Sequence, residues 1–166
     1  MKTNKKLAVA FTGPSNSGKT TLIIKVSIAL KKEGYNVAIV KHDPKDKAIF
    51  DQEGKDSYKF AQTGANVAVI SSKRTTIFNQ QPSDITEVIN KLGDFDFLLV
   101  EGLKTLPLPR ICIQRDNINQ DYFSVSDTIA TDNSIDRSLF PQQMQIIDLN
   151  DTNQIVSWIK SNAKEV

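Results

Sequence analysis

The chain contains one cysteine, Cys112, among its 166 residues. A single cysteine cannot form a disulfide within the chain, and it excludes a metal site built from several thiolates. Cys112 stands between Ile111 and Ile113 in the segment Arg110–Gln114. We therefore expect it to be a small core residue rather than a nucleophile.

The sequence also has no marked excess of charge of one sign and no long hydrophobic run. It has 21 basic and 19 acidic residues, so charge gives no basis for predicting binding to nucleic acid or to a membrane. After the basic start Met1–Lys6, only the five apolar residues Leu7–Phe11 precede a glycine, far fewer than a signal peptide or a membrane span needs. We expect a cytoplasmic protein with one domain, residues 1–166.

A phosphate-binding loop is the clearest motif. Residues Gly13–Thr20 read GPSNSGKT, which matches the pattern GxxxxGK[ST]. The apolar run Leu7–Phe11 before it has the length of a strand, and Thr21–Leu30 after it has apolar residues at helical spacing. In such a loop Lys19 reaches the β- and γ-phosphates and the Thr20 hydroxyl binds Mg²⁺. The motif predicts that the chain binds a nucleoside triphosphate.

The rest of the chain alternates between strand and helix patterns. Strands are predicted near 6–12, 36–41, 66–71, 74–79, 96–101, 110–115 and 145–148, and helices near 19–33, 56–63, 83–92 and 151–163. This alternation predicts an α/β fold, a single-domain P-loop NTPase with a mainly parallel β-sheet and helices on both faces. The polar stretch 116–144 is interpreted as a long functional or interface excursion.

Two polar groups follow predicted strands. Glu101 ends the apolar strand Phe97–Val100, where phosphate-loop proteins place a carboxylate beside Mg²⁺. Asp43 follows Lys41 and His42 after another strand, and it can orient the metal shell or the attacking group. Taken alone, each is better explained as a surface or loop residue, but beside the phosphate loop the functional interpretation is favoured.

Several short motifs together resemble one family. The phosphate loop, KHD at 41–43, GKDS at 54–57, TGA at 63–65 and VEGLK at 100–104 occur in the order and spacing of the molybdopterin-guanine dinucleotide biosynthesis protein family MobB. The resemblance covers roughly residues 7–115, and LPRI at 108–111 extends it.

The resemblance implies a small protein that binds GTP with Mg²⁺, hydrolyses GTP weakly and forms a homodimer. It also implies a partner, a MobA-like molybdenum cofactor guanylyltransferase that attaches GMP to molybdopterin, with direct binding of molybdopterin left open. Lys19, Asp43 and Glu101 would serve hydrolysis, and Thr20, Asp43 and Glu101 would hold the metal. The nucleotide-binding residues would be Gly13, Pro14, Ser15, Asn16, Ser17, Gly18, Lys19, Thr20 and Thr21.

The sequence departs from related patterns in two ways. The second histidine that family members often have after KH is missing, since Asp43 is followed by Pro44, so its role cannot be transferred. The guanine-specific NKxD motif is also absent, and Thr131-Asp132 and Ser126-Asp127 are alternative base-contacting acids. Guanine preference therefore rests on the resemblance.

Two other functions stay open. An ATP-dependent small-molecule kinase or ligase of the dethiobiotin-synthetase type shares the phosphate loop and the VEG strand, but this chain has no second glycine pair after Gly102. A small nucleotide kinase would need an arginine-rich lid, whereas the four arginines here are scattered. A nucleotide-gated adaptor, whose function is to bind a partner, is the non-enzymatic alternative.

The segment Thr75–Asn79 is the best candidate for an unpaired edge strand, since it is rich in β-branched and aromatic residues. A two-fold related copy can extend the sheet at such an edge. We therefore expect the homodimer to form there.

Overall fold

The computed structural model describes residues 5–166, which group into two compact units. The core unit combines the chain up to His42 with Asp94–Val166, and the inserted unit is Asp43–Gly93. The sequence predicts one domain over residues 1–166, and no local pattern in it marks the boundary between the two units. Each unit is described by itself.

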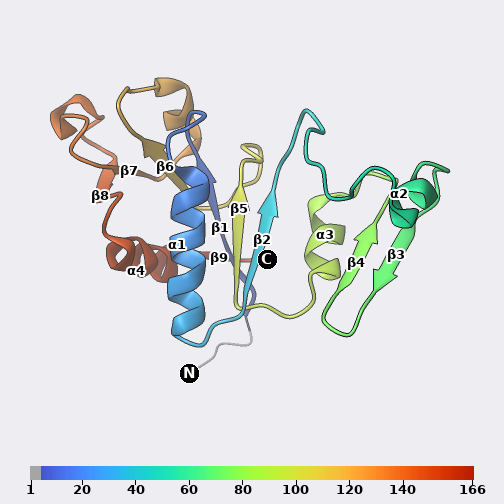
Figure 1. Ribbon diagram of the computed structural model, residues 1–166. Helices are drawn as coiled ribbons and strands as arrows, with labels where there is room; N and C mark the ends of the chain where they lie inside the picture. The colour runs from blue at the N-terminus through green and yellow to red at the C-terminus, as the bar shows by residue number, and fades with distance from the viewer. Residues whose placement is uncertain (1–4) are drawn as a thin grey trace. The chain divides into compact units, whose positions relative to one another are not determined.

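The core unit is built on a sheet whose strands run in the order β2-β5-β1-β6-β7-β8, with β9 beside β1 (Figure 1). All neighbours in this order are parallel, and only β9 is antiparallel. The mainly parallel sheet is therefore confirmed. The strands are β1 (Leu7–Thr12), β2 (Val37–Lys41), β5 (Phe97–Glu101), β6 (Arg110–Gln114), β7 (Thr128–Thr131), β8 (Gln145–Asp148) and β9 (Lys164–Glu165).

Two α-helices, α1 (Lys19–Lys32) and α4 (Thr152–Asn162), cover one face of this sheet (Figure 1). Each places an apolar stripe on the sheet because its large aliphatic residues recur at helical spacing, such as Leu22 and Val26 in α1 and Ile155 and Ile159 in α4. The Asp151 carboxylate caps α4 by accepting a hydrogen bond from the Gln154 backbone N–H at 2.9 Å.

The opposite face is covered beside β6 and β7 by two short 3₁₀ helices, η1 (Gln120–Val125) and η2 (Arg137–Leu139), and their loops. Cys112 and Ile129 are buried there against Tyr122, Phe123 and Phe140. The expectation of helices on both faces is thus confirmed, and so is the placement of Cys112 in the core. Burial raises the pKa of the Cys112 thiol, which is consistent with an inert core residue.

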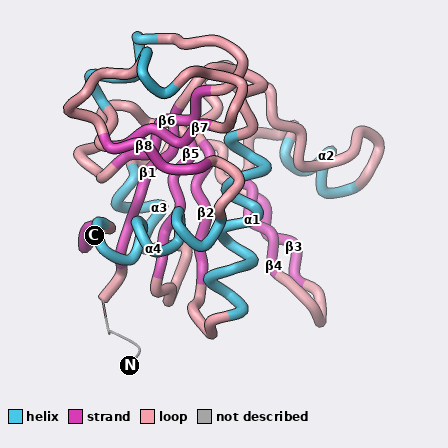
Figure 2. The backbone as a smooth tube through the Cα atoms, turned by 90° about the vertical axis from the view of Figure 1, so that its left-hand side faces the viewer, coloured by secondary structure: helices cyan, strands magenta, loops and turns pink. Residues whose placement is uncertain are grey.

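The interpretation of 116–144 as an excursion is wrong. Within it, β7 pairs with β6 on one side and with β8 on the other, and all four of its residues are buried. The strand was missed because it is only four residues long and half threonine. The Thr128 hydroxyl donates to the Gln145 carbonyl at 2.8 Å, which satisfies this buried group. Figures 1 and 2 show the loops after β6 and β7 at the same end of the sheet as the loop after β1.

The inserted unit contains α2 (Asp56–Ala61), the hairpin of β3 (Val67–Ile70) and β4 (Thr75–Phe78), and α3 (Ile85–Lys91). β3 and β4 pair antiparallel as a separate two-stranded sheet, so the predicted edge strand belongs to this hairpin and not to the main sheet. Ser71 closes the turn, since its N–H donates to the Arg74 carbonyl at 2.9 Å. None of the helices in residues 5–166 has the length and apolar character needed to cross a membrane.

Candidate functional site

The loop between β1 and α1 has the tight backbone that a phosphate cradle needs. Gly13, Asn16 and Gly18 have positive φ angles of 140°, 63° and 95°. A Cβ atom on Gly13 would lie 2.3 Å from the carbonyl oxygen of Ile113 in β6. Only glycine can therefore occupy this position while the loop stays against β6.

The amino end of α1 has backbone donors available for an anion. Gly18 is the N-cap residue, it provides no side-chain cap, and the first turn contains no acidic residue. The first N–H groups of a helix have no partner within the helix, and the helix dipole places partial positive charge there. This arrangement suits a phosphate group.

Lys19 adds a mobile cation to the loop. Its Nζ donates to the carbonyl oxygens of Gly13 at 3.0 Å and of Pro14 at 2.5 Å. Partial burial lowers the pKa of Lys19, and the nearby Glu101 carboxylate opposes this shift. The ammonium is therefore held inside the loop, where it can neutralise phosphate oxygens.

A cavity of about 440 Å³ opens over this loop. Most of the predicted nucleotide-binding residues lie around it together with one acid, and its lining is Ser15, Asn16, Gly18, Lys19, Thr20, Thr21 and Glu101. Gly13 and Pro14 contact Lys19 as described, and Ser17 is buried beneath the loop. Ser17 Oγ has no hydrogen-bond partner among the described residues, which leaves one buried polar group for a ligand to satisfy.

Glu101 reaches this cavity because of strand register. Its Cα pairs with Phe11 of β1 on one side and with Lys41 of β2 on the other. Glu101 and the exposed Thr20 hydroxyl are both oxygen ligands, and Mg²⁺ usually takes one or two protein oxygens together with phosphates and waters. The pair therefore fits Mg²⁺, although residues 5–166 contain no cluster of three or more metal-ligating side chains.

Asp43 belongs to the inserted unit. Its carboxylate accepts backbone hydrogen bonds from Lys47 and Ala48, both at 2.7 Å, and from Lys45 at 3.3 Å. These bonds shape the loop that follows β2. The role of Asp43 as a metal ligand stays a prediction. His42, in the core unit, donates its backbone N–H to the Glu101 carbonyl at 3.0 Å.

Of the two alternative base-contacting acids, Asp132 follows β7 and Asp127 precedes it. Asp127 Oδ2 accepts the backbone N–H of Arg110 at 2.8 Å, so it holds the start of β6. Asp132 lies at the carboxyl end of its strand, as the phosphate loop does. Its pKa is lowered, first by hydrogen bonds from the side chain and backbone of Ser134 and also by the charge of Arg115.

Arg110 has a structural role that is not apparent from the sequence. Its side chain is fully buried, and its guanidinium donates to the carbonyl oxygens of Gly102 at 2.7 Å, Leu103 at 2.9 Å and Leu106 at 3.2 Å. Burial lowers the pKa of Arg110, and the Asp127 carboxylate opposes the shift. Arg110 therefore fixes the loop that follows Glu101. The sequence around Arg110 carries no signal of this role, because the three carbonyls come from a loop that only the fold brings beside it.

Comparison with known proteins links this geometry to one family. Residues 8–132 match the family model described as molybdopterin guanine dinucleotide synthesis protein B. A putative molybdopterin-guanine dinucleotide biosynthesis adapter protein of Methanocaldococcus jannaschii is 31% identical over 119 residues. That match covers 68% of this chain but only 49% of the relative, so the chain spans about half the length of this protein.

Two further comparisons cover nearly the whole chain. The molybdopterin-guanine dinucleotide biosynthesis adapter protein of Haemophilus influenzae is 28% identical over 163 residues, which are 92% of this chain and 87% of that protein. The crystal structure of Bacillus subtilis MobB superposes with a TM-score of 0.75 at 26% identity, over 95% of this chain and 98% of that chain. The hydrogenase maturation factor HypB from Archaeoglobus fulgidus shares the fold, with a TM-score of 0.53, 20% identity, and coverage of 94% of this chain and 87% of that one.

Replacing Arg110 with methionine is predicted to destabilise the core unit. The substitution leaves three backbone carbonyls of the Glu101 loop without their donor, at about 1–3 kcal/mol for each buried group that water cannot reach. We expect urea denaturation to show a free energy of unfolding lower by about 3 kcal/mol. Arg137→Met, at an exposed arginine, is the matched control. Equal stability of the two variants would show that Arg110 does not hold the loop.

Proposed function

Because the chain belongs to the molybdopterin guanine dinucleotide synthesis protein B family, we propose that it is a GTP-binding adapter in molybdenum cofactor biosynthesis. In this proposal it binds GTP with Mg²⁺, hydrolyses GTP weakly, and assists a MobA-like guanylyltransferase in attaching GMP to molybdopterin. The observation that carries the proposal is the phosphate cavity, which brings Lys19, Thr20 and Glu101 together in a chain of this family.

Each part of the cavity has a distinct task in binding. The backbone donors at the start of α1 hold the phosphates, and the Lys19 ammonium moves from the loop carbonyls to the β- and γ-phosphate oxygens. Thr20 and Glu101 would hold Mg²⁺, which offsets the phosphate charge when it is bound. Asp43 is assigned to the same metal shell.

The lining of the cavity supports weak hydrolysis. Efficient nucleotide hydrolysis uses a residue that positions water and an arginine that stabilises the transition state, the latter contributing about 10³–10⁵-fold. The described residues around the cavity include neither an arginine nor a glutamine. Such a site binds the triphosphate more effectively than it cleaves it, which suits an adapter whose state depends on its nucleotide.

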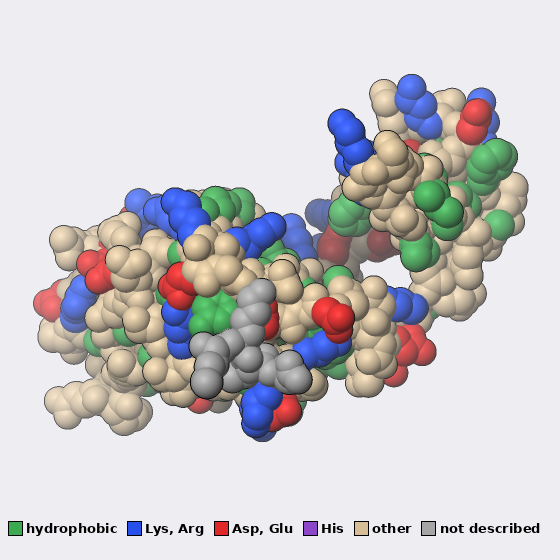
Figure 3. All heavy atoms as spheres, turned by 90° about the horizontal axis from the view of Figure 1, so that it is seen from below, with side chains coloured by type: hydrophobic (Ala, Val, Ile, Leu, Met, Phe, Trp, Pro, Cys, Tyr) green, Lys and Arg blue, Asp and Glu red, His purple; other side chains and the backbone are tan. Residues whose placement is uncertain are grey.

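We place this activity in the cytoplasm and in a homodimer. Large apolar side chains are exposed on the inserted unit, among them Ile49, Phe50, Ile70 and Ile77, with 71–88% of their surface accessible. Figure 3 shows hydrophobic side chains at the surface of this part of the chain. β4 pairs with β3 on one side only within the described residues, so its other edge can take a strand from a second copy.

The nucleotide function is tested first at Lys19. Lys19→Ala removes the mobile cation and leaves neutral amides, so we expect GTP affinity to fall at least tenfold, on the order of 1.5–3 kcal/mol. Calorimetry on the folded variant measures this, and Lys32→Ala at the far end of α1 is the control. We also expect Lys19→Ala to remove the stimulation of GMP transfer in an assay with the guanylyltransferase and molybdopterin. Unchanged GTP affinity would contradict the phosphate-loop assignment.

A second prediction separates the metal from the phosphates. If Glu101 serves Mg²⁺, Glu101→Gln weakens nucleotide binding when Mg²⁺ is present and has little effect in chelator, where there is no metal charge to balance. Titrations of both proteins under the two conditions measure the difference. Equal weakening with and without Mg²⁺ would mean that Glu101 has only a structural role.

The third prediction concerns the dimer. Ile77→Lys places a charge on the exposed face of β4, and Phe78→Pro places a residue in that strand that cannot donate a backbone hydrogen bond. We expect light scattering at tens of micromolar to give a dimer mass for the original chain, and monomers or insoluble protein for the variants. Ile28→Lys, at a half-exposed isoleucine of α1, should keep the dimer. A monomer mass for the original chain would refute the assignment.

A further inference from the structure

A second, smaller cavity adjoins the phosphate cavity. It has a volume of about 80 Å³, and residues from α1 and from the ends of β6 and β8 form its walls: Gly18, Thr21, Leu22, Lys25, Arg115, Leu149 and Asn150. Gly18 and Thr21 line both cavities. A nucleotide whose phosphates occupy the first cavity can therefore extend its nucleoside part into the second.

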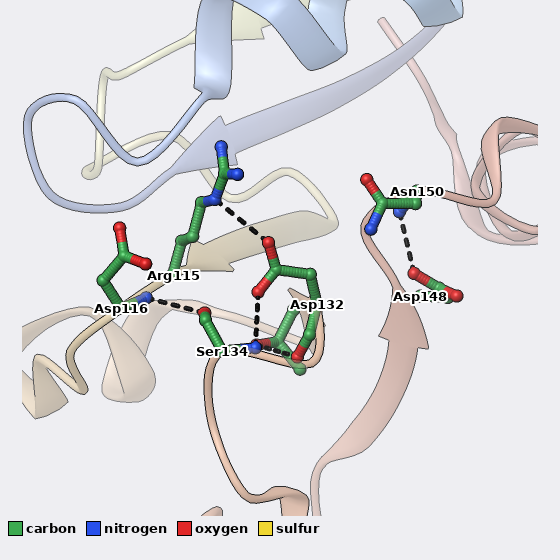
Figure 4. Close-up of polar contacts among 7 residues, drawn as sticks. Arg115, Asp116, Asp132, Ser134, Asp148 and Asn150 are labelled. Atoms are coloured by element: carbon green, nitrogen blue, oxygen red, sulfur yellow. Dashed lines mark hydrogen bonds and ion pairs between the residues drawn. The ribbon is translucent and has the colours of Figure 1, made fainter.

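Backbone contacts and an ion pair hold Arg115 in place at this cavity. Its backbone forms an isolated bridge with Asn117, whose N–H donates to the Arg115 carbonyl at 2.7 Å. Between them Asp116 has a φ of 63°, and its N–H donates to Ser134 Oγ at 2.8 Å. The Nε of Arg115 forms an ion pair with Asp132 Oδ2 at 3.0 Å (Figure 4). The loops after β6 and β7 thus hold one guanidinium in place.

This ion pair leaves the outer edge of the guanidinium available. Nε is committed to Asp132, whereas Nη1 and Nη2 have no hydrogen-bond partner among residues 5–166, and the Arg115 side chain is 52% exposed. In Figure 4 the Arg115 and Asn150 side chains face each other across a gap, in agreement with their shared lining of the cavity. Leu22 and Leu149, both largely buried, form the apolar part of this cavity's lining.

We infer that the second cavity takes the purine ring of the nucleotide and that Arg115 reads its O6/N7 edge, so that guanine is preferred over adenine. Guanine presents two acceptors on this edge, O6 and N7, which a planar guanidinium with two outward N–H₂ groups can satisfy together. Adenine presents a donor, its N6 amino group, in place of O6. The guanidinium only donates hydrogen bonds, so it cannot pair with the N6 amino group, which is also a donor. This inference rests on the proposed function, because it requires a bound nucleoside triphosphate.

The neighbouring polar groups suit this task less well. Asp132 is not part of the cavity lining, its side chain is 12% exposed, and its oxygens accept from Arg115 and from the Ser134 N–H at 2.9 Å. We therefore assign Asp132 the positioning of Arg115 rather than contact with the base. The Asn150 side-chain amide can both donate and accept, so rotating it serves either purine.

A panel of four triphosphates tests the inference on the unmodified protein. ITP lacks the 2-amino group but keeps O6 and N7, so it should bind within about twofold of GTP. ATP and 7-deaza-GTP each lose one acceptor of the edge, and we expect them to bind about tenfold more weakly, at the lower end of what a bidentate arginine–guanine contact provides. Competition against a fluorescent GTP analogue, with Mg²⁺ present, gives all four affinities.

Two variants assign the preference to Arg115. Arg115→Gln removes the guanidinium, whose N–H groups only donate hydrogen bonds. Arg115→Lys keeps the positive charge beside Asp132 but loses the planar pair of donors. In both we expect the ratio of GTP to ATP affinity to fall to within about twofold of one, mainly through weaker GTP binding. Arg137→Gln, an exposed arginine on η2, controls for the lost charge and should keep the original ratio. A thermal melt of each variant checks that it is folded.

The outcomes separate this inference from the proposed function. If the original chain binds no triphosphate, the proposed function fails and the inference fails with it. If triphosphates bind but GTP and ATP bind equally, or if Arg115→Lys keeps the full preference, only the inference is overturned. Weak binding of ITP together with normal binding of 7-deaza-GTP would also overturn it, because the base would then be read at its N1 and 2-amino groups.

Discussion

The site depends on the backbone pairing of β1 with two parallel neighbours. β5 lies on one side and brings Glu101 level with Phe11, and β6 lies on the other and brings Ile111 level with the same residue. The loop then turns directly over β6, where the absence of a side chain at Gly13 lets it approach the Ile113 carbonyl. Hydrogen bonds between main chains thus fix the spacing of cation, acid and loop. Side-chain substitutions around the site can alter its chemistry without moving these three parts.

The phosphate-binding loop of the site could be predicted because its residues are consecutive in sequence. A loop motif between a strand and a helix specifies its own shape, so Gly13, Gly18 and Lys19 were identified before their surroundings were known. Glu101 could be predicted as well, since parallel strands bring their carboxyl ends to one edge. Asp43 shows the limit, because its carboxylate binds its own loop and its relation to the metal is a matter of tertiary arrangement.

The features that were missed depend on contacts between distant segments. β7 is four residues long, and its threonines are buried only because strands lie on both sides of it. Arg110 has the sequence of an ordinary polar strand end, yet three carbonyls of a preceding loop enclose its guanidinium. Arg115 becomes notable only after β7 has placed Asp132 beside it. Periodicity cannot reveal a group whose partners come from other elements.

The way in which the inserted unit interrupts the chain bears on folding. β2 and β5 are neighbours in the sheet, but residues 42–96 separate them, including the entire inserted unit. The entropy of closing a loop grows only with the logarithm of its length, at about 0.6 kcal/mol for each doubling. Shortening or lengthening this segment therefore changes the closure cost of the β2–β5 pair very little. Evolution can remodel the crossover as a separate module while the nucleotide-binding sheet keeps its register.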